Sequence, residues 1–541
     1  MPIEIKNHKE DESVRSAFEH IESIRRGFGV DSGLDPKGQS IVSSLQGMIQ
    51  RSLQKLSNDL YSEQGHFVLE LIQNADDNHY PSECLPTLRF VLSDRQIIVC
   101  NNEIGFRSED VDAICNVGGS TKGKHKLGYA GHKGIGFKSV FMVSNRPEIH
   151  SRDYHFCFDT VDGTEKIGYI CPIWLHSRDD ILPDAKEWTT YIRLPIQRNG
   201  RIQEDFNNIQ SKLLLFLHRL RRIEIVSQSE NSSNMDRCRS FTRIDHADGK
   251  VVELQEKSIN GTISKTFWLV VKKVLQVPED IKEKLHEVKG DIHSTTIAIA
   301  YPLSGLQRST QQGTPAQPLF AYLPLRSYGF RFILQADFEV PVTRQEILHD
   351  NIWNEWLKSE MIQLLPSAYA YFQNLPTLLT SSLSGLGIGN SLTDIQVLIY
   401  FLKFIPIRNE LDPYFNTFVD KSMKLLMGLI KLPVSKEDEN GQIQTEWIQT
   451  SQCVLVKDSF IRKILPEELL LSHFNKYYVP EQIASECNER TLIKLGCAPL
   501  QFSSIIRLIK ELYKQHEQEH STKTSSIKQS ESININILFH I

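Results

Sequence analysis

Residues 66–77 place four polar side chains on one face of an otherwise apolar helix. Glu70, Gln73, Asn74 and Asp77 follow the i, i+3, i+4 and i+7 spacing of a single helix face. The other positions are filled mainly by Phe67, Val68, Leu69, Leu71, Ile72 and Ala75. A helix that is apolar on its remaining sides is buried, and buried polar groups must be paired or must line a cavity. The pattern therefore predicts either an internal site or a polar seam satisfied within the core.

Two residues of this polar stripe suit hydrolytic chemistry. The amide oxygen of Asn74 can ligate Mg²⁺, a hard ion that prefers oxygen ligands and phosphates. The carboxylate of Glu70 lies one helical turn away and can orient and deprotonate a water molecule. His66 and Glu70 also share this face, but two residues do not make a zinc site.

A glycine-rich loop, GHKGIGFKS, occupies residues 131–139. It narrowly misses the P-loop pattern, with one extra residue before Lys-Ser, and it lacks the third glycine of the dinucleotide fingerprint. What remains is a glycine loop that runs into a helix start, where backbone N–H groups and a positive dipole end can receive an anion. Positive charge is added by Lys122, Lys124, Lys126, Lys133 and Lys138. The alternative is a basic surface loop.

Three motifs in this order resemble the GHKL superfamily of gyrase B, Hsp90-type chaperones, histidine kinases and MutL. They are ELIQNADD (70–77), NNEIGF (101–106) and GHKGIGF (131–137). The first is similar to the superfamily's N box, Glu-x-x-x-Asn-Ala-x-Asp, and the third to its second glycine box. The resemblance implies a two-layer α/β sandwich that binds ATP and Mg²⁺ under a lid, here residues 118–131.

The resemblance also implies roles for individual residues. Glu70 would be the general base, and Asn74 would ligate Mg²⁺. Further nucleotide contacts are implied at Asp77, Asn101, Gly105, Lys122, Gly131, Lys133, Gly134, Gly136, Phe137 and Thr190. Among these, Asp77 is a pocket carboxylate, the glycines and Phe137 form the phosphate loop, and Thr190 lies near the adenine.

One position departs from the superfamily pattern. The first glycine box usually begins with an aspartate, whose carboxylate accepts a hydrogen bond from the adenine amino group. Asn101 stands at this position. An amide oxygen can accept the same bond, but less strongly than an ionised oxygen. Adenine affinity and specificity therefore stay open on the sequence alone.

The same departure is a signature of one branch, because the chain is similar to the sacsin and plant NO VEIN type over roughly residues 15–360. The matching segments are KLSNDLY (55–61), FVLELIQNADD (67–77), NNEIGF (101–106), GHKGIGFKSVF (131–141), FAYLPLRSYG (320–329) and DFEVP (337–341).

Arg344 is the second candidate catalytic residue. The segment PVTRQEIL (341–348) resembles the catalytic loop of the Hsp90 middle domain, in which an arginine reaches the ATP γ-phosphate. A guanidinium fork suits a transferring phosphoryl group. The alternative is a surface arginine paired with Glu346 or Asp350.

Composition bounds the remaining function classes. The 541-residue chain has a net charge of -5, with acidic and basic residues well mixed, so no basic surface for nucleic acid is indicated. Its nine cysteines include no CxxC pair and are expected to be free thiols. The N-terminal MPIEIKNHKEDESVR has no apolar core of a signal peptide, and no apolar run approaches the ~20 residues of a membrane helix. We expect a cytoplasmic or nuclear protein that does not enter a membrane.

The expected fold class is α+β. The domains are an N-terminal helical extension (1–46), the ATP-binding sandwich (47–226), an Hsp90-middle-like α/β domain (227–358), a mostly helical interaction region (359–514) and a low-complexity or disordered tail (515–541). Strands are expected at 87–92, 96–100, 154–158, 166–171 and 189–194, with a hairpin formed by 320–325 and 328–336.

The favoured function is an ATP-binding, slowly hydrolysing chaperone or regulatory protein, in which lid closure gates the binding of protein clients and dimerisation can accompany ATP binding. A nucleotide-binding scaffold without hydrolysis is the alternative; the departure at Asn101 favours it and the intact Glu70 opposes it. A nucleic-acid-linked ATPase is less favoured because the chain is mildly acidic and has no zinc or basic module. A histidine kinase is less favoured still, since no His-containing dimerisation helix precedes residue 70.

Overall fold

The computed structural model describes most of the chain. The described residues are 2–30, 33–60, 66–116, 136–161, 167–176, 187–196, 202–228, 237–285, 292–304, 314–341, 346–383, 392–437 and 442–522. The chain forms two compact units. The first comprises Met1–Leu303, Pro318–Ser327 and Ile333–Leu357, and the second comprises Ser304–Gln317, Tyr328–Phe332 and Lys358–Ile541.

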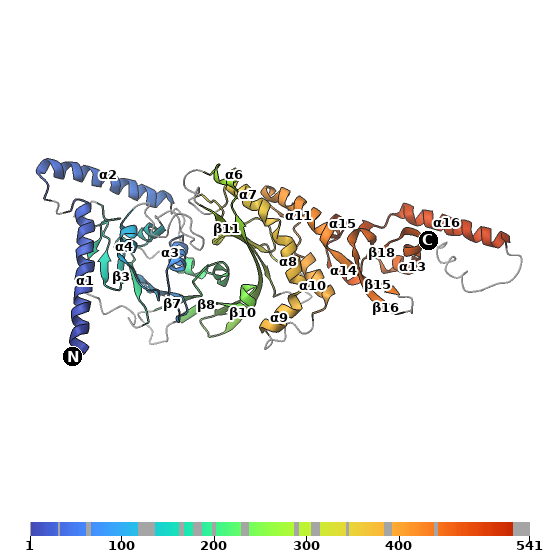
Figure 1. Ribbon diagram of the computed structural model, residues 1–541, viewed down its shortest axis with the longest axis horizontal. Helices are drawn as coiled ribbons and strands as arrows, with labels where there is room; N and C mark the ends of the chain where they lie inside the picture. Colours follow the sequence, from blue (N-terminus) through green and yellow to red (C-terminus); the bar gives the residue numbers. More distant parts are fainter. Residues whose placement is uncertain are drawn as a thin grey trace. The chain divides into compact units, whose positions relative to one another are not determined.

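The first unit is mixed α/β and is built on one large mixed sheet (Figure 1). In spatial order the described strands are β13 (Leu323–Ser327), β12 (Pro318–Ala321), β14 (Ile333–Gln335), β11 (Ser294–Pro302), β10 (Ile263–Gln276), β9 (Val251–Lys257), β8 (Arg237–His246), β7 (Arg222–Ser227), β1 (Thr87–Leu92), β2 (Gln96–Asn101), β6 (Thr190–Pro195), β3 (Glu148–Ser151), β4 (Tyr154–Cys157) and β5 (Ile173–Trp174). The pairs β1–β7 and β12–β14 are parallel, and the other neighbours are antiparallel.

Helices and short 3-10 turns complete this unit. They are α1 (Pro2–Gly27), α2 (Pro36–Leu60), α3 (His66–Asp77), α4 (Ser108–Cys115), η1 (Gly136–Met142), α5 (Ile202–Asn207), η2 (Ser211–Leu215), η3 (Ala247–Gly249), α6 (Glu279–Lys282) and α7 (Ile352–Met361), the last of which crosses the boundary at 357/358.

The middle of strand β2, residues 97–100, is apolar because both of its faces are covered. Ile97 and Val99 belong to the same core cluster as Leu71 of α3, so α3 lies on their face of the sheet. Ile98 packs with Trp188 on the opposite face. The alternation places every second residue of β2 under α3.

Several predicted elements are confirmed. The helix expected at 66–77 is α3, and the strands expected at 87–92, 96–100, 154–158 and 189–194 are β1, β2, β4 and β6 within one residue at each end. None of the nine cysteines forms a disulfide, and seven are buried. The mixed α/β character is as expected, whereas the GHKL-specific sandwich stays a prediction.

The strand expected at 166–171 is wrong. Residues 167–170 form a turn in which the backbone N–H groups of Ile170 and Cys171 both donate to Ile167 O. The apolar side chains of this turn pack with Leu53 of α2. A turn whose apolar residues are mostly buried gives the same apolar signal as a short strand.

The hairpin expected from 320–325 and 328–336 is also different. The observed hairpin joins β12 to β13 through Tyr322, whose φ of 62° lies in the left-handed region. Strand β14 instead pairs with β11 and β12. The apolar pattern located the strands but did not identify their partners.

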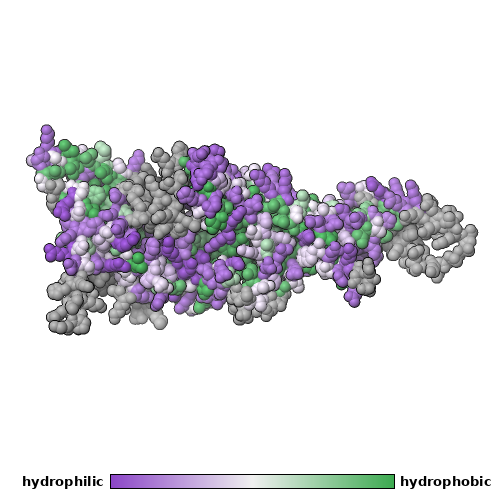
Figure 2. Space-filling view, in the orientation of Figure 1, coloured by the Kyte–Doolittle hydropathy of each residue, from purple (hydrophilic) through white to green (hydrophobic). Residues whose placement is uncertain are grey.

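Helix α2 exposes an apolar stripe. Ile41, Leu45, Met48 and Ile49 are between 41% and 59% exposed, and Figure 2 shows this green surface along the helix. Leu53, one helical turn after Ile49, is buried. Within the described residues, no helix is both long enough and apolar enough to cross a bilayer.

The second unit contains helices and two small sheets. Its elements are α8 (Leu364–Gln373), α9 (Leu375–Leu383), α10 (Asp394–Leu402), η5 (Arg408–Glu410), η6 (Pro413–Phe415), α11 (Asn416–Leu429), β15 (Lys431–Glu437), β16 (Ile443–Gln449), η7 (Thr450–Gln452), β17 (Cys453–Leu455), α12 (Ser459–Ile464), α13 (Glu467–Phe474), β18 (Tyr477–Tyr478), α14 (Glu481–Glu486), α15 (Glu489–Lys494), β19 (Ala498–Pro499) and α16 (Phe502–Thr522).

This unit is mostly helical, as expected, but it also contains strands that the sequence analysis did not predict. Strands β15 and β16 form an antiparallel hairpin, and β17 pairs in parallel with β18 and β19. Strands of two or three residues, such as β18 and β17, leave almost no periodic signal in a sequence. Helix α16 continues to Thr522, inside the tail expected from residue 515.

Candidate nucleotide site

The predicted polar stripe lies on α3 as expected, and part of it is deeply buried. Gln73 is 1% exposed and Asp77 is 2% exposed, whereas Glu70 and Asn74 are half-buried. Both amide atoms of Gln73 are buried without a hydrogen-bonding partner. A buried amide without partners is unfavourable by roughly 1–3 kcal/mol, so it calls for a function or a ligand.

The first and third motifs meet at Glu70 and Gly136. Gly136 begins η1, and a Cβ atom at this position would overlap Glu70 Oε2. The absence of a side chain at Gly136 therefore lets the turn approach the carboxylate of the candidate base. The structure brings these two predicted residues together across some 65 residues of sequence.

The residues after Gly136 enter the core. Phe137 packs against Phe158, with ring centroids 6.2 Å apart. Lys138 is 5% exposed, and its Nζ donates to Ile114 O and Tyr169 O at 2.6 and 2.8 Å. Burial lowers the pKa of Lys138 to about 8. The expectation that Lys138 adds charge to an anion-binding loop is therefore wrong, because this ammonium group ties α4 to the 167–170 turn.

A row of polar side chains crosses the sheet at one end of the apolar face. Asn101 of β2 lies opposite Thr190 of β6, and Thr190 lies opposite Ser151 of β3. All three are buried, with exposed fractions of 5%, 3% and 0%. Opposite residues in antiparallel strands point to the same face. We call Asn101, Thr190 and Ser151 the polar row.

Asn101 is held by its own neighbours. Its Oδ1 accepts from the backbone N–H of Glu103 at 2.9 Å, and its Nδ2 donates to the Tyr80 hydroxyl at 3.0 Å. Burial raises the pKa of Tyr80, so this hydroxyl keeps its proton and donates to Ala75 O at 2.7 Å. The side chain of Asn101 thus links β2 to α3.

Glu103 joins the polar row from the turn after β2. Its Oε1 accepts from Thr190 Oγ1 at 2.8 Å, and Thr190 Oγ1 lies 2.6 Å from Ser151 Oγ. Ser151 Oγ accepts from the backbone N–H of Phe106 at 2.9 Å. Thr190 therefore lies beside a carboxylate that the sequence analysis did not single out, and its expected position near an adenine stays a prediction.

Gly105 follows in the same turn, with a φ of 90°. A Cβ atom here would overlap the Arg152 side chain, which covers this backbone from the β3–β4 turn. The conformation and the close approach both require glycine.

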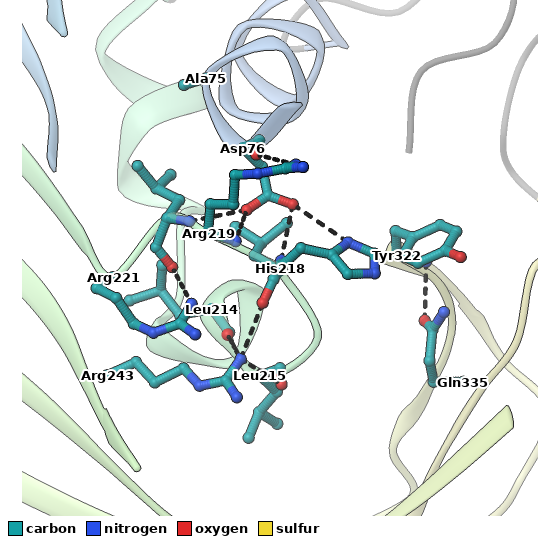
Figure 3. A network of polar contacts seen from close by, with 12 residues as sticks. Ala75, Asp76, Leu214, Leu215, His218, Arg219, Arg221, Arg243, Tyr322 and Gln335 are labelled. Atoms are coloured by element: carbon teal, nitrogen blue, oxygen red, sulfur yellow. Dashed lines mark hydrogen bonds and ion pairs between the residues drawn. The ribbon is translucent and has the colours of Figure 1, made fainter. Parts of the chain in front are cut away.

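Asp76 occupies a different environment on the same helix (Figure 3). Its carboxylate accepts backbone N–H groups from His218, Arg219 and Leu220, each at 2.8 Å. Burial opposes ionisation of this group, but its contacts with His218 and the backbone of residues 218–220 outweigh burial and lower the pKa of Asp76. His218 Nδ1 lies 3.7 Å from Oδ2, beyond hydrogen-bonding distance.

This network continues beyond residues 218–220. Arg243 of β8 donates to the carbonyls of Leu214, Leu215 and Leu217, as Figure 3 shows in part. The His218 ring packs on Tyr322, with centroids 5.2 Å apart, and the N–H of Tyr322 donates to Gln335 Oε1. Asp76 therefore secures the connection between α3 and the chain that leads into β7.

Five predicted site residues lie outside the described residues. They are Lys122, Gly131, Lys133, Gly134 and Arg344. The sequence analysis in turn missed Glu103, Ser151 and Asp76. A signal for Glu103 was available, since it is the carboxylate within NNEIGF, the motif in which the usual aspartate is replaced.

Comparisons with known proteins bear on the branch that the sequence resembles. No family model matches the chain. The chain is 34% identical to Protein NO VEIN of Arabidopsis thaliana over 484 residues, which is 86% of this chain and 16% of that protein. The chain thus spans about a sixth of the relative's length. This similarity supports the resemblance to the NO VEIN branch.

Proposed function

We propose that the chain binds ATP with Mg²⁺ between α3, η1 and the polar row, and hydrolyses it slowly. The observation that carries the proposal is the packing of Gly136 against the carboxylate of Glu70. Two motifs with separate chemical meaning, a candidate base and a candidate phosphate loop, thereby become parts of one site.

The residues present fit a nucleotide with its metal. The orphaned amide of Gln73 offers one donor group and one acceptor on α3. The described residues contain no cluster of three His, Cys, Asp or Glu side chains that could hold an ion. Mg²⁺ would instead be bound by Asn74 and the phosphates, as this ion commonly is, and would neutralise charge on the phosphate oxygens.

The proposed reaction is attack of water on the γ-phosphorus, with loss of the bond to the β–γ bridging oxygen. Glu70 would orient the water and take its proton, and ADP and inorganic phosphate would leave. Arg344 would stabilise charge on the transferring group. Turnover would be slow because closure of the lid, residues 118–131, gates the reaction.

Calorimetric titration with Mg·ATP and steady-state hydrolysis test this proposal. The wild type should bind and turn over ATP. Glu70→Ala should keep binding and lose turnover by about 10²–10⁴-fold, the usual contribution of a general base. Glu109→Ala, an exposed carboxylate in α4, serves as the control and should match the wild type. Equal turnover in wild type and Glu70→Ala would remove Glu70 as the base.

One observation favours the second candidate, a nucleotide-binding scaffold without hydrolysis. Asn101 replaces the usual aspartate, and both the oxygen and the nitrogen of its amide form hydrogen bonds within the protein. Binding without turnover in the same titrations would select this scaffold, and absence of binding would refute both nucleotide functions.

The chaperone or regulatory role extends the proposal from the site to its use. ATP-driven lid closure would gate the binding of protein clients in the cytoplasm or nucleus. Aggregation of heat-denatured citrate synthase, followed by light scattering, tests this role. Suppression that differs between ATP and ADP supports it, and identical curves with both nucleotides and without them contradict it.

A further inference from the structure

The polar row is arranged on the helix-covered face of the sheet. Ile97, Val99 and Asn101 are every second residue of β2 and therefore point to the same face of the sheet. Ile97 and Val99 belong to the core cluster that includes the apolar side of α3. Thr190, Ile192 and Leu194 likewise share one face of β6. The polar row therefore ends an apolar face close to the stripe of α3, where the proposed nucleotide would lie.

Proton counting gives the row a direction. Thr190 donates its single O–H to Glu103 Oε1. Thr190 Oγ1 must then accept from Ser151, whose own oxygen accepts the N–H of Phe106. Three donors in series point toward Glu103. Such a chain strengthens each of its bonds and stabilises negative charge at its end.

Asn101 is unsuited to the same task. Its amide is oriented by a donor on one side, Glu103 N–H, and by an acceptor on the other, Tyr80 Oη. Turning the amide oxygen toward another group would break one of these bonds within a site of low exposure. Asn101 fixes the turn that carries Glu103, and Glu103 supplies the carboxyl group that receives the chain of donors.

We propose that Glu103 selects the base of the bound nucleotide by accepting a hydrogen bond from the exocyclic amino group of adenine, and that Asn101 only positions this turn. The proposal rests on the proposed nucleotide function. Adenine presents an N–H₂ donor at position 6, whereas guanine and hypoxanthine present a carbonyl oxygen there. A buried carboxylate accepts from the first and repels the others.

Calorimetric affinities for Mg·ATP, Mg·GTP and Mg·ITP test the assignment. The wild type should prefer ATP, and Glu103→Gln should reduce the ATP-to-GTP affinity ratio by at least about tenfold, because a neutral amide can also donate to a carbonyl oxygen. Glu148→Gln is the matched control. Glu148 is a buried carboxylate of β3 that accepts from Arg193 at 3.1 Å, and its replacement should leave the ratio unchanged.

Two further variants keep the test decisive. Asn101→Asp should leave ATP affinity equal or weaker, since it removes the donor to Tyr80 and adds charge beside Glu103. Thr190→Val removes the hydroxyl that supports Glu103 and should weaken ATP more than GTP, which tests the assignment even if Glu103→Gln does not fold. Thermal unfolding establishes which variants are folded.

The outcomes separate the two proposals. Wild type that binds none of the three nucleotides overturns the nucleotide function and this assignment with it. Wild type that binds ATP while folded Glu103→Gln keeps the full ATP preference overturns the assignment alone. Tighter ATP binding by Asn101→Asp would give the base contact to position 101 and would also overturn it.

Discussion

Asp76 and Glu103 are both buried carboxylates close to the C-terminal end of α3, with exposed fractions of 0% and 4%, yet their partners differ in kind. Asp76 accepts three backbone N–H groups from one short loop, whereas Glu103 accepts from a series of side-chain hydroxyls in the polar row. Backbone donors fix the path of the chain. The hydroxyl donors, Thr190 of β6 and Ser151 of β3, instead support the carboxylate of Glu103. Burial alone does not separate the structural carboxylate of Asp76 from the recognition carboxylate proposed for Glu103, but the origin of their donors does.

The largest expected change in stability is at Asp76. Asp76→Ala should lower the free energy of unfolding by roughly 3–5 kcal/mol, because three buried N–H groups lose a charged acceptor. Urea denaturation measures the loss as a lower midpoint at an unchanged slope. Asp94→Ala, an exposed aspartate in the β1–β2 turn, is the control and should stay within about 0.5 kcal/mol of wild type.

Acid pH gives an independent check of this assignment. The pKa of Asp76 is lowered in the folded state, so its stabilisation is fully present above the pKa of an unfolded aspartate, about 3.9, and is lost as pH falls through the lowered value. The gap between wild type and Asp76→Ala should therefore narrow only below about pH 4. A gap of constant size down to pH 2 would show that the charge of Asp76 does not stabilise the fold.

Lys138 extends the comparison to a buried cation held by backbone carbonyls. Its pKa of about 8 lies below the ordinary 10.5, so the unfolded chain binds more protons than the folded chain between these values. Stability should therefore rise with pH across this window, by up to about 3 kcal/mol relative to Lys138→Met. Denaturation curves from pH 7 to 10.5 measure the difference, and parallel pH profiles for the two proteins would contradict it.

Gln73 tests the proposed nucleotide site through a substitution that should raise the stability of the protein, whereas Asp76→Ala should lower it. Gln73→Leu removes two unpaired buried polar atoms and should stabilise the protein by about 1–2 kcal/mol, while weakening ATP binding or turnover. Gln46→Leu is a suitable control because that amide is paired, with Nε2 donating to Phe28 O. A destabilised Gln73→Leu protein would mean that the amide is satisfied within the fold.

The smallest expected change in stability is at Gly136. In Gly136→Ala the new methyl group would displace Glu70 Oε2, the free end of a flexible side chain, so stability should change by less than about 1 kcal/mol. Turnover should nevertheless fall at least about tenfold, because the candidate base is moved. Gly428→Ala, in α11 where an added Cβ has open space, is the control for added side-chain volume. Unchanged turnover would separate Gly136 from the chemistry.

The sequence predicted local elements better than their partners. Helix α3 and strands β1, β2 and β6 were located because periodic apolar residues report directly on burial. The stripe of α3 was correct for Glu70 and Gln73 but passed over Asp76, whose partners at 218–220 are about 140 residues away in the chain. Lys138 was misread for the related reason that closeness in sequence to a glycine loop says nothing about the direction of a side chain.

The polar row was beyond sequence reasoning because it depends on strand register. Asn101 and Ser151 meet Thr190 only because β2 and β3 both pair with β6 at these positions. A shift of one residue would turn each side chain to the other face. The prediction of the hairpin partner of β12 was wrong for the same reason, since strand pairing is set by tertiary contacts and by the turn at Tyr322.

The parallel pairing of β1 with β7 also governs when the site can form. Residues 93–221, which include β2, β3, β6 and the donors to Asp76, all lie between these two paired strands. Closing so long a segment places a late, non-local step in folding. During synthesis, this face of the sheet would stay incomplete until the ribosome has released the chain beyond Ser227. The time for which its apolar strands are exposed to aggregation therefore depends on the translation rate as well as on stability.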